Sequence, residues 1–241
     1  MSILHNPHVL IHHIDAMAVE GTGPDTSLGS GGHRPRLLII AGATGTGKST
    51  ASIKIAQREG FQRIVSTDNI REVLRSVDVD ESNQALHRSS YSLGETREPV
   101  QDWLDTCQVL EDAILATIAK SRREGFDLVI EGVHVVPSDR ILRSWTESGG
   151  FAMGVVMVVH DENLHQAMFV EREKNTYRKA ERYIANLQRI RAIQDGLIER
   201  AKIANWQIID PHRVDDDVER IITLFRRKQS EGESASRLKK L

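Results

Sequence analysis

The chain has 241 residues, its formal net charge at pH 7 is -2, and 39% of its residues are hydrophobic. This length allows one large domain or two small ones, and the near-neutral charge excludes a protein that coats nucleic acid with bulk positive charge. The single cysteine, Cys107, excludes a disulfide framework within the chain and favours the reducing cytosol. The longest apolar runs are too short to span a bilayer, and no basic stretch precedes an apolar one at the start. We therefore expect a cytoplasmic protein with neither a membrane span nor a signal peptide.

The first 36 residues differ in composition from the rest of the chain. Residues 21–35 are rich in Gly, Pro and Ser, which is typical of a linker, and four histidines precede them. Two of these histidines are one helical turn apart and could share a metal ion, but no cysteine or carboxylate set lies nearby at metal-ligand spacing. We therefore interpret residues 1–36 as a flexible arm, residues 37–228 as a folded domain and residues 229–241 as a polar tail.

From residue 37 onward, short apolar runs alternate with helical patterns. The apolar runs predict strands at residues 37–41, 63–66, 128–130, 155–159 and 206–209. Helical patterns are predicted at residues 48–58, 69–76, 99–123 and 216–227, with a helical pair between residues 169 and 202. Cys107 lies on the apolar stripe of the longest helix, so we interpret it as core rather than as a nucleophile. That stripe could serve a core or a dimer, so the oligomeric state stays open.

The most specific motif of the chain lies between the first strand and the first helix. Residues 42–49 read GATGTGKS and match the phosphate-binding pattern G-x-x-x-x-G-K-[S/T], here called the P-loop. Its glycines let several backbone N–H groups point into one concavity, the lysine reaches the β- and γ-phosphates, and the last hydroxyl binds Mg²⁺. A glycine-rich turn without a ligand is the alternative, but the flanking strand and helix favour nucleotide binding. The predicted nucleotide-binding residues are Gly42, Ala43, Thr44, Gly45, Thr46, Gly47, Lys48, Ser49 and Thr50.

This motif and the alternating pattern together predict the fold class. Strands that alternate with helices form a parallel sheet with helices on both faces. We therefore expect an α/β fold, namely a P-loop NTPase three-layer sandwich with a mostly parallel five-stranded sheet and a helical lid.

The end of the second strand carries the first candidate acid, Asp68. The carboxyl ends of parallel strands line the crevice where ligands bind. There Asp68 could orient or deprotonate an attacking hydroxyl, or hold Mg²⁺ through water; the alternative role is a helix N-cap. Arg71 and Arg75 follow one helical turn apart and predict an anionic co-substrate, unless they belong to a solvated face.

The third strand ends in a second candidate acid, Glu131. An acid at this position reaches Mg²⁺ or the water around it in phosphate-loop proteins. Gly132 lets the backbone pass close to a ligand, and His134 is either a substrate contact or a structural histidine. The predicted metal ligands are Ser49, Asp68 and Glu131.

The segment after the fourth strand is locally basic. Between residues 169 and 202 it holds nine Lys or Arg against five acids. We interpret residues 161–202 as a lid whose arginines neutralise a transferring phosphoryl group and help to exclude water. Arg172 is the first candidate, followed by Arg182, Arg189 and Arg191. A solvated face is the alternative; an RNA surface is disfavoured because the segment lacks interleaved aromatic residues, so we expect no nucleic acid partner. The predicted catalytic residues are Lys48, Asp68, Glu131 and Arg172.

Several segments of the chain resemble the 2-phosphoglycerate kinases, P-loop kinases that convert 2-phosphoglycerate to 2,3-bisphosphoglycerate. The segments that carry the resemblance are residues 42–50, STDNIREVLR at 66–75, LHRSSYSLGE at 86–95, IEGVHVVP at 130–137 and the lid-side helix at 183–201. They occur in the family's order over roughly residues 37–210.

The resemblance implies ATP and Mg²⁺ as partners and a small, acidic, phosphorylated three-carbon acceptor. It also implies which residues face the site: Asp68, Arg71, His87, Ser89, Ser90, Tyr91, Glu131 and His134. Arginines and hydroxyl donors suit a substrate that carries a carboxylate and a phosphate. Arg75 joins these residues as a predicted substrate contact. Two alternatives remain: a P-loop kinase of another acceptor, such as a sugar, a sugar acid or a nucleotide-sugar as in zeta-toxin-like kinases, and a non-catalytic ATP-binding regulator.

Overall fold

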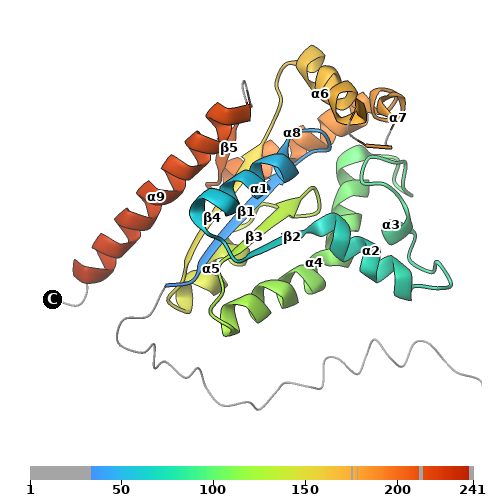
Figure 1. Ribbon diagram of the computed structural model, residues 1–241. Helices are drawn as coiled ribbons and strands as arrows, with labels where there is room; N and C mark the ends of the chain where they lie inside the picture. Colours follow the sequence, from blue (N-terminus) through green and yellow to red (C-terminus); the bar gives the residue numbers. More distant parts are fainter. Residues whose placement is uncertain (1–33, 175, 178, 212–213, 239–241) are drawn as a thin grey trace, which may run out of the picture. The chain divides into compact units, whose positions relative to one another are not determined.

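The computed structural model describes residues 34–174, 176–177, 179–211 and 214–238, so the predicted arm lies outside the described residues up to residue 33. Its strands form one parallel sheet in the order β2-β3-β1-β4-β5 (Figure 1). The strands are β1 (Arg36–Gly42), β2 (Arg63–Ser66), β3 (Leu128–Gly132), β4 (Phe151–Met157) and β5 (Gln207–Ile209). β1 is the central strand, with β3 on one side and β4 on the other. The predicted α/β fold with a five-stranded sheet is confirmed.

Helices cover both faces of this sheet. They are α1 (Lys48–Glu59), α2 (Thr67–Val77), α3 (Gln84–His87), α4 (Pro99–Arg123), α5 (Asp139–Glu147), α6 (Glu162–Lys174), α7 (Ala180–Ile184), α8 (Leu187–Ile203) and α9 (Val214–Leu238). Alternate residues of β1 separate the two cores, because successive side chains of a strand point to opposite faces. Leu38 and Ile40 belong to the core that α1 and α9 close, whereas Leu37 and Ile39 belong to the core under α4, α5 and α8. These are the three predicted layers.

The helix α4 forms much of the second core. It begins at Pro99, a residue suited to the first turn of a helix, and buries Trp103, Cys107 and Leu110. The indole of Trp103 donates a hydrogen bond to the carbonyl of Val133 at 2.7 Å. Burial raises the pKa of the Cys107 thiol well above its ordinary value, so this cysteine is an inert part of the core, as predicted.

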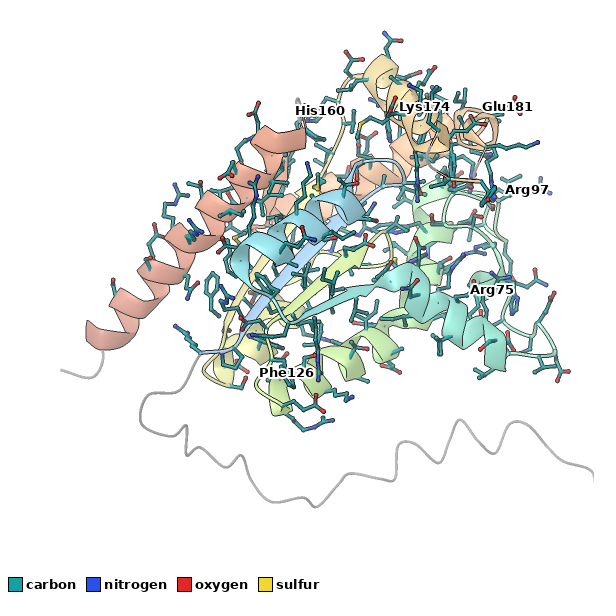
Figure 2. All side chains as sticks on the ribbon, viewed as in Figure 1. Arg75, Arg97, Phe126, His160, Lys174 and Glu181 are labelled. Carbon is teal, nitrogen blue, oxygen red and sulfur yellow. The ribbon has the colours of Figure 1, made fainter. Side chains whose placement is uncertain are left out.

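The predicted lid segment folds as three helices. α6 and α7 pack against each other, and Lys174 and Glu181 mark them in Figure 2. α8 follows α7 directly and packs against α4. The lid segment is therefore joined to the rest of the fold through α8, which packs against α4 and against the strands β1, β4 and β5.

Four elements differ from the sequence predictions. β4 lies at residues 151–157 rather than 155–159, and α5 and the short α3 were not predicted. α9 continues to Leu238, beyond the predicted end at Arg227 and through most of the predicted tail. Within the described part of the chain, no helix combines the length and the apolar character that crossing a membrane requires.

Candidate functional site

The P-loop connects β1 to α1 at the carboxyl edge of the sheet. Gly45 has φ 86° and Gly47, the residue before α1, has φ 83°, a left-handed conformation that glycine adopts without strain. Lys48 Nζ donates to the carbonyl of Ala43 at 2.7 Å, and the Thr46 hydroxyl donates to the same carbonyl at 3.1 Å. These two bonds link the end of the loop back to its beginning and so hold it in a closed turn.

The predicted acid Glu131 lies beside this loop. It is the penultimate residue of β3, next to β1, with Ile40 as its register partner, and only 6% of its surface is exposed. The Ser49 hydroxyl donates to its Oε1 at 3.1 Å. Burial lowers the pKa of Lys48, while Glu131 and Asp68 act to raise it and Arg172 acts to lower it further. The loop thus combines one buried cation with a hydroxyl and a carboxylate.

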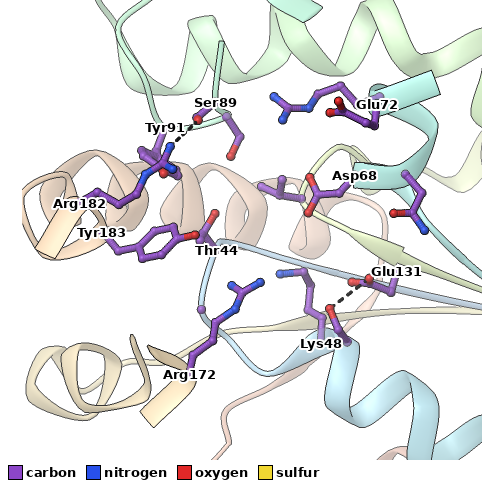
Figure 3. Close-up of a pocket in the computed structure, with 16 residues that line it drawn as sticks. Thr44, Lys48, Asp68, Glu72, Ser89, Tyr91, Glu131, Arg172, Arg182 and Tyr183 are labelled. Carbon is purple, nitrogen blue, oxygen red and sulfur yellow. Dashed lines mark hydrogen bonds between the residues drawn. The ribbon is translucent and has the colours of Figure 1, made fainter. Parts of the chain in front are cut away.

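A pocket of about 330 Å³ opens next to the P-loop (Figure 3). Its lining comes from the P-loop, α2, the segment after α3, β3 and the lid. The lining residues are Thr44, Gly45, Lys48, Ser49, Asp68, Asn69, Arg71, Glu72, Ser89, Ser90, Tyr91, Glu131, Val133, Arg172, Arg182 and Tyr183. The pocket therefore brings together all four predicted catalytic residues and four of the predicted substrate contacts.

The charges of the pocket lie on two sides. Figure 3 shows Asp68 and Glu72 entering from α2, and Arg172 and Arg182 entering from the lid. Asp68 is in the first turn of α2, and 54% of its side chain is exposed. The N-cap of α2 is Ser66, whose hydroxyl accepts a hydrogen bond from the backbone N–H of Asp68. The N-cap alternative for Asp68 was therefore wrong, and its carboxylate points into the pocket.

A buried histidine supports this end of α2. The Nδ1 of His134 lies 3.1 Å from the Thr67 hydroxyl and 3.8 Å from Asp68 Oδ1. Burial lowers the pKa of His134 to about 4; Asp68 acts to raise it, and Arg71 and Lys48 act to lower it. The ring is therefore neutral at pH 7. It lies behind the pocket wall and does not line the pocket, which fits the structural alternative for His134.

Gly132 allows β3 and α2 to meet at this point. A Cβ on Gly132 would lie 1.7 Å from the Thr67 hydroxyl oxygen, and its φ is 155°. The glycine was predicted to allow a close approach to a ligand; the close approach that the structure shows is to Thr67. It brings Glu131 and Asp68, from two different elements, into one pocket.

Besides His134, two further predicted substrate contacts lie outside the pocket lining. Arg75 pairs with Glu72 at 2.9 Å, one turn further along α2 (Figure 2). His87 pairs with Asp78 at 3.0 Å at the end of α3. The guanidinium of Arg71, which does line the pocket, donates to the carbonyl of Arg88.

The lid meets the P-loop and the Tyr91 side of the pocket through a row of rings. His165 donates from Nε2 to the carbonyl of Thr44 at 2.9 Å and stacks on Phe169, with 4.9 Å between ring centroids. Phe169 stacks on Tyr183 at 5.1 Å, and Tyr183 meets Tyr91 edge-on at 5.6 Å. Burial lowers the pKa of His165, so its ring is neutral in this row. Offset and edge-on rings attract one another, so this row ties the lid to both the P-loop and the pocket.

Of the four predicted lid arginines, two reach the pocket. Arg172 lines it and lies near the face of Tyr183, and Arg182 donates to the Ser89 hydroxyl at 3.3 Å. Arg189 and Arg191 bond backbone carbonyls elsewhere and are absent from the lining.

A second hollow of about 430 Å³ lies on the other flank of the P-loop. Its lining residues are Gly45, Thr46, Gly47, Lys48, Ser49, Thr50, Ala51, Met157, Met168, Glu171, Arg172, Thr176, Pro211 and Asp217. Gly45, Lys48, Ser49 and Arg172 line both hollows, so they lie at the junction. Gly42 and Ala43 are buried beneath the loop. In the described part of the chain, no cluster of three or more His, Cys, Asp or Glu forms a ready metal site.

Sequence reasoning missed several lining residues. Asn69 and Glu72 lie on α2, and Glu72 is four residues after Asp68 and therefore on the same helical face. This spacing could have identified Glu72. Tyr183 enters the pocket only through the packing of α7, which no local pattern indicates.

Comparisons with known proteins agree with this geometry. The 2-phosphoglycerate kinase of Methanopyrus kandleri is 31% identical over 208 residues, covering 83% of this chain and 63% of that protein. The same enzyme of Thermococcus kodakarensis is 31% identical over 201 residues, covering 80% of this chain and 67% of that protein. The chain thus spans about two thirds of the length of these relatives, and the resemblance predicted from the sequence is confirmed.

A solved structure and a family model complete the comparison. A candidate kinase from Chloroflexus aurantiacus has the same fold, with a TM-score of 0.52 at 15% identity, over 83% of this chain and 100% of that one. The model of the Zeta toxin family matches residues 25–230, which is most of the chain. This chain therefore belongs to the Zeta toxin family.

Proposed function

We propose that this chain is an ATP-dependent kinase that phosphorylates a hydroxyl of a small anionic acceptor. The first candidate acceptor is 2-phosphoglycerate, which would become 2,3-bisphosphoglycerate. The observation that carries the proposal is the pocket beside the P-loop, where Lys48, Asp68, Glu131 and Arg172 converge. The relatives named 2-phosphoglycerate kinase support the choice of acceptor.

The residues of the P-loop fit ATP and Mg²⁺. The turn at Gly45 and Gly47 carries no side chain that would obstruct phosphates, and α1 begins at the end of the loop. The Ser49 hydroxyl and the Glu131 carboxylate are the oxygen ligands that Mg²⁺ prefers. When bound, the ion would neutralise charge on the transferred phosphoryl group. The second hollow, with Met157, Met168 and Pro211 in its lining, offers apolar surface for a nucleoside.

In the proposed transfer, some pocket residues stabilise negative charge and another accepts a proton. The reaction forms a bond between the acceptor oxygen and the γ-phosphorus and breaks the bond from that phosphorus to the oxygen that leaves with ADP. Lys48 and Arg172 stabilise the negative charge on the transferred group, because both lie where the two hollows meet. Asp68 orients the acceptor hydroxyl and takes up its proton.

The side of the pocket away from the P-loop supports an anionic acceptor. Arg71, Arg182, Ser89 and Ser90 supply cationic and hydroxyl donors there. A volume of about 330 Å³ is at the small end for a ligand pocket, which favours a three-carbon acceptor over a nucleotide-sugar.

The test is a coupled ADP-release assay with Mg·ATP and a panel of acceptors led by 2-phosphoglycerate, then sugars, sugar acids and a nucleotide-sugar. We expect turnover that depends on 2-phosphoglycerate, abolition by Lys48→Ala, and a loss of kcat of about 10²- to 10⁴-fold in Asp68→Asn with little change in ATP binding. Asp139→Asn is the matched control, because Asp139 is also an exposed acid in the first turn of a helix, α5, but does not line the pocket.

The remaining outcomes separate the alternatives. Turnover of a sugar or nucleotide-sugar instead of 2-phosphoglycerate would keep the kinase and replace the acceptor. ATP binding without turnover of any acceptor would favour a nucleotide-dependent regulator. Normal kcat in Asp68→Asn would remove Asp68 from the proton transfer.

A further inference from the structure

The segment that carries the acceptor-side hydroxyls has no regular secondary structure. Residues 88–98, here called the acceptor loop, connect α3 to α4, and Ser89, Ser90 and Tyr91 of this loop line the pocket. Its own backbone contributes a bond from the Ser92 N–H to the Ser89 carbonyl at 2.9 Å. Arg97, which is labelled in Figure 2, belongs to this loop. Its φ is 62°, a left-handed conformation that is unfavourable for residues other than glycine. The shape of the loop therefore depends on contacts from outside it.

Asp102, in the first turn of α4, supplies the first of these contacts. Its Oδ2 accepts the backbone N–H of Gly94 at 2.8 Å, and its Oδ1 accepts the hydroxyl of Thr96 at 2.8 Å and the Thr96 N–H at 3.2 Å. The loop approaches the carboxylate so closely that a Cβ on Gly94 would lie 2.4 Å from Oδ1. One buried carboxylate thus satisfies three donors of the acceptor loop.

Arg189, on α8 of the lid segment, supplies the second set of contacts that hold the acceptor loop. Its guanidinium donates to the carbonyls of Tyr91 at 2.9 Å, Ser92 at 3.1 Å and Arg97 at 3.0 Å. It also pairs with Asp102 Oδ2 at 2.9 Å. A guanidinium holds its five N–H donors in a fixed plane, a geometry that the three rotatable donors of a lysine do not provide. The carbonyl of Arg97 that it holds belongs to the residue with the left-handed backbone.

The Arg189–Asp102 pair is buried but does not line the pocket. The exposed fractions of the two side chains are 17% and 1%. Burial acts to raise the pKa of Asp102, but hydrogen bonds from Gly94, Thr96 and Arg189 outweigh it and leave the pKa below its ordinary value. The carboxylate therefore stays ionised at neutral pH, and the Arg189–Asp102 pair, here called the clamp, keeps both of its charges.

We infer that Arg189 and Asp102 are positioning residues for the acceptor, because together they hold the acceptor loop so that Ser89, Ser90 and Tyr91 face the pocket. The inference rests on the proposed kinase function and adds a role to it. Arg189 was predicted to neutralise the phosphoryl group. In this inference it acts on the acceptor indirectly, by holding the loop whose side chains bind the acceptor. Neither residue lines the hollow assigned to the nucleoside, so ATP binding does not depend on them.

The test uses the full chain with three changes and one control. Arg189→Gln removes the guanidinium. Gly94→Ala places a methyl group against both Asp102 Oδ1 and the guanidinium of Arg88, and so displaces the loop without changing any charge. The double change Asp102→Asn with Arg189→Gln removes both charges, so no carboxylate is left buried alone. Arg122→Gln is the control, because Arg122 also donates to a carbonyl between two elements, that of Ser144 at 2.7 Å, away from the pocket.

Two readouts separate positioning from a loss of general stability. We expect each change to raise the acceptor KM by about tenfold or more, since several hydrogen bonds to charged groups are lost, and to change the ATP KM by less than about twofold. Amide hydrogen exchange across residues 88–98 should become faster in the three variants and stay unchanged in Arg122→Gln.

Each other result overturns the inference in a recognisable way. An unchanged acceptor KM, or an ATP KM that rises by the same factor, would refute positioning. If the unaltered chain phosphorylates no acceptor, the proposed function has failed, and hydrogen exchange still decides whether the clamp orders the loop. Unchanged exchange in all three variants would refute the clamp itself.

Discussion

Lowering the pH below 6.5 should destabilise the fold through His134. The ring is buried against Thr67 and Asp68, and its pKa falls from 6.5 to about 4 in the folded chain. Between these two values the unfolded chain binds a proton that the folded chain excludes. Stability therefore rises with pH across this window and is lost as the pH falls from 6.5 toward 4.

The size of the effect follows from the two pKa values. When the pH falls below both pKa values of His134, the free energy of unfolding decreases by about 3 kcal/mol in total. This follows because the pKa shifts from 6.5 to about 4 and one pKa unit corresponds to about 1.4 kcal/mol. At pH 5 the linkage relation gives about 2 kcal/mol of this loss. That is a large share of the stability of an ordinary domain, which is about 5–15 kcal/mol.

The measurement compares urea unfolding of the unaltered chain and of His134→Asn at pH 7.5 and pH 5.0. Asn keeps a polar group near Thr67 but does not titrate. His165, whose pKa is also lowered, titrates in both proteins and cancels in the difference. We expect the stability advantage of the unaltered chain to shrink by about 2 kcal/mol at pH 5.0. An advantage of the same size at both pH values would refute the assignment of a neutral, buried His134.

Three further changes probe the site. Gly132→Ala should lower the free energy of unfolding by about 3 kcal/mol in urea titrations, because its Cβ would meet Thr67, whereas Gly125→Ala, at φ 71° and in open space, should cost about 1 kcal/mol. Arg172→Gln should lower kcat by about 10²-fold or more with a small change in the stability of the fold, and a kcat within twofold would exclude a role in transfer. Glu131→Gln should raise the Mg²⁺ concentration needed for half-maximal turnover by about tenfold, measured in the ADP-release assay; an unchanged requirement would remove Glu131 from the metal ligands.

The sheet could be predicted from the sequence because buried parallel strands read as continuous apolar runs. β4 was the exception, because Gly154 interrupts its apolar run in the middle of the strand. The structure explains Gly154: a Cβ there would lie 2.2 Å from the ring of Trp206, so the glycine makes room for a core indole and does not end the strand. The last part of α9 has few apolar residues and was therefore predicted as a tail. Ion pairs one turn apart on the helix surface, such as Arg227 with Glu231 at 3.7 Å, support the helix there.

The site was predictable where one motif or one strand end determines a position. Lys48 and Asp68 follow strands and Glu131 lies near the end of one. The carboxyl ends of these strands meet, so local patterns sufficed to bring the three residues into one pocket. Arg75 and His87 were predicted from spacing and resemblance, but pairing with Glu72 and Asp78 decides where their side chains lie. Such pairs form between elements or between turns, and an apolar pattern does not encode them.

The contact between Gly45 and Phe169 has a consequence for how related chains vary. A Cβ at position 45 would lie 2.1 Å from Cε1 of Phe169, so the lid rests directly on the glycine of the P-loop. The choice of residue at position 45 is therefore limited by the lid as well as by its positive φ of 86°. We expect covariation: family members with Asn or Asp at the position of Gly45 should carry a smaller residue at the position of Phe169. The two positions would then diverge as a pair, and a P-loop transplanted without its matching lid residue would not close.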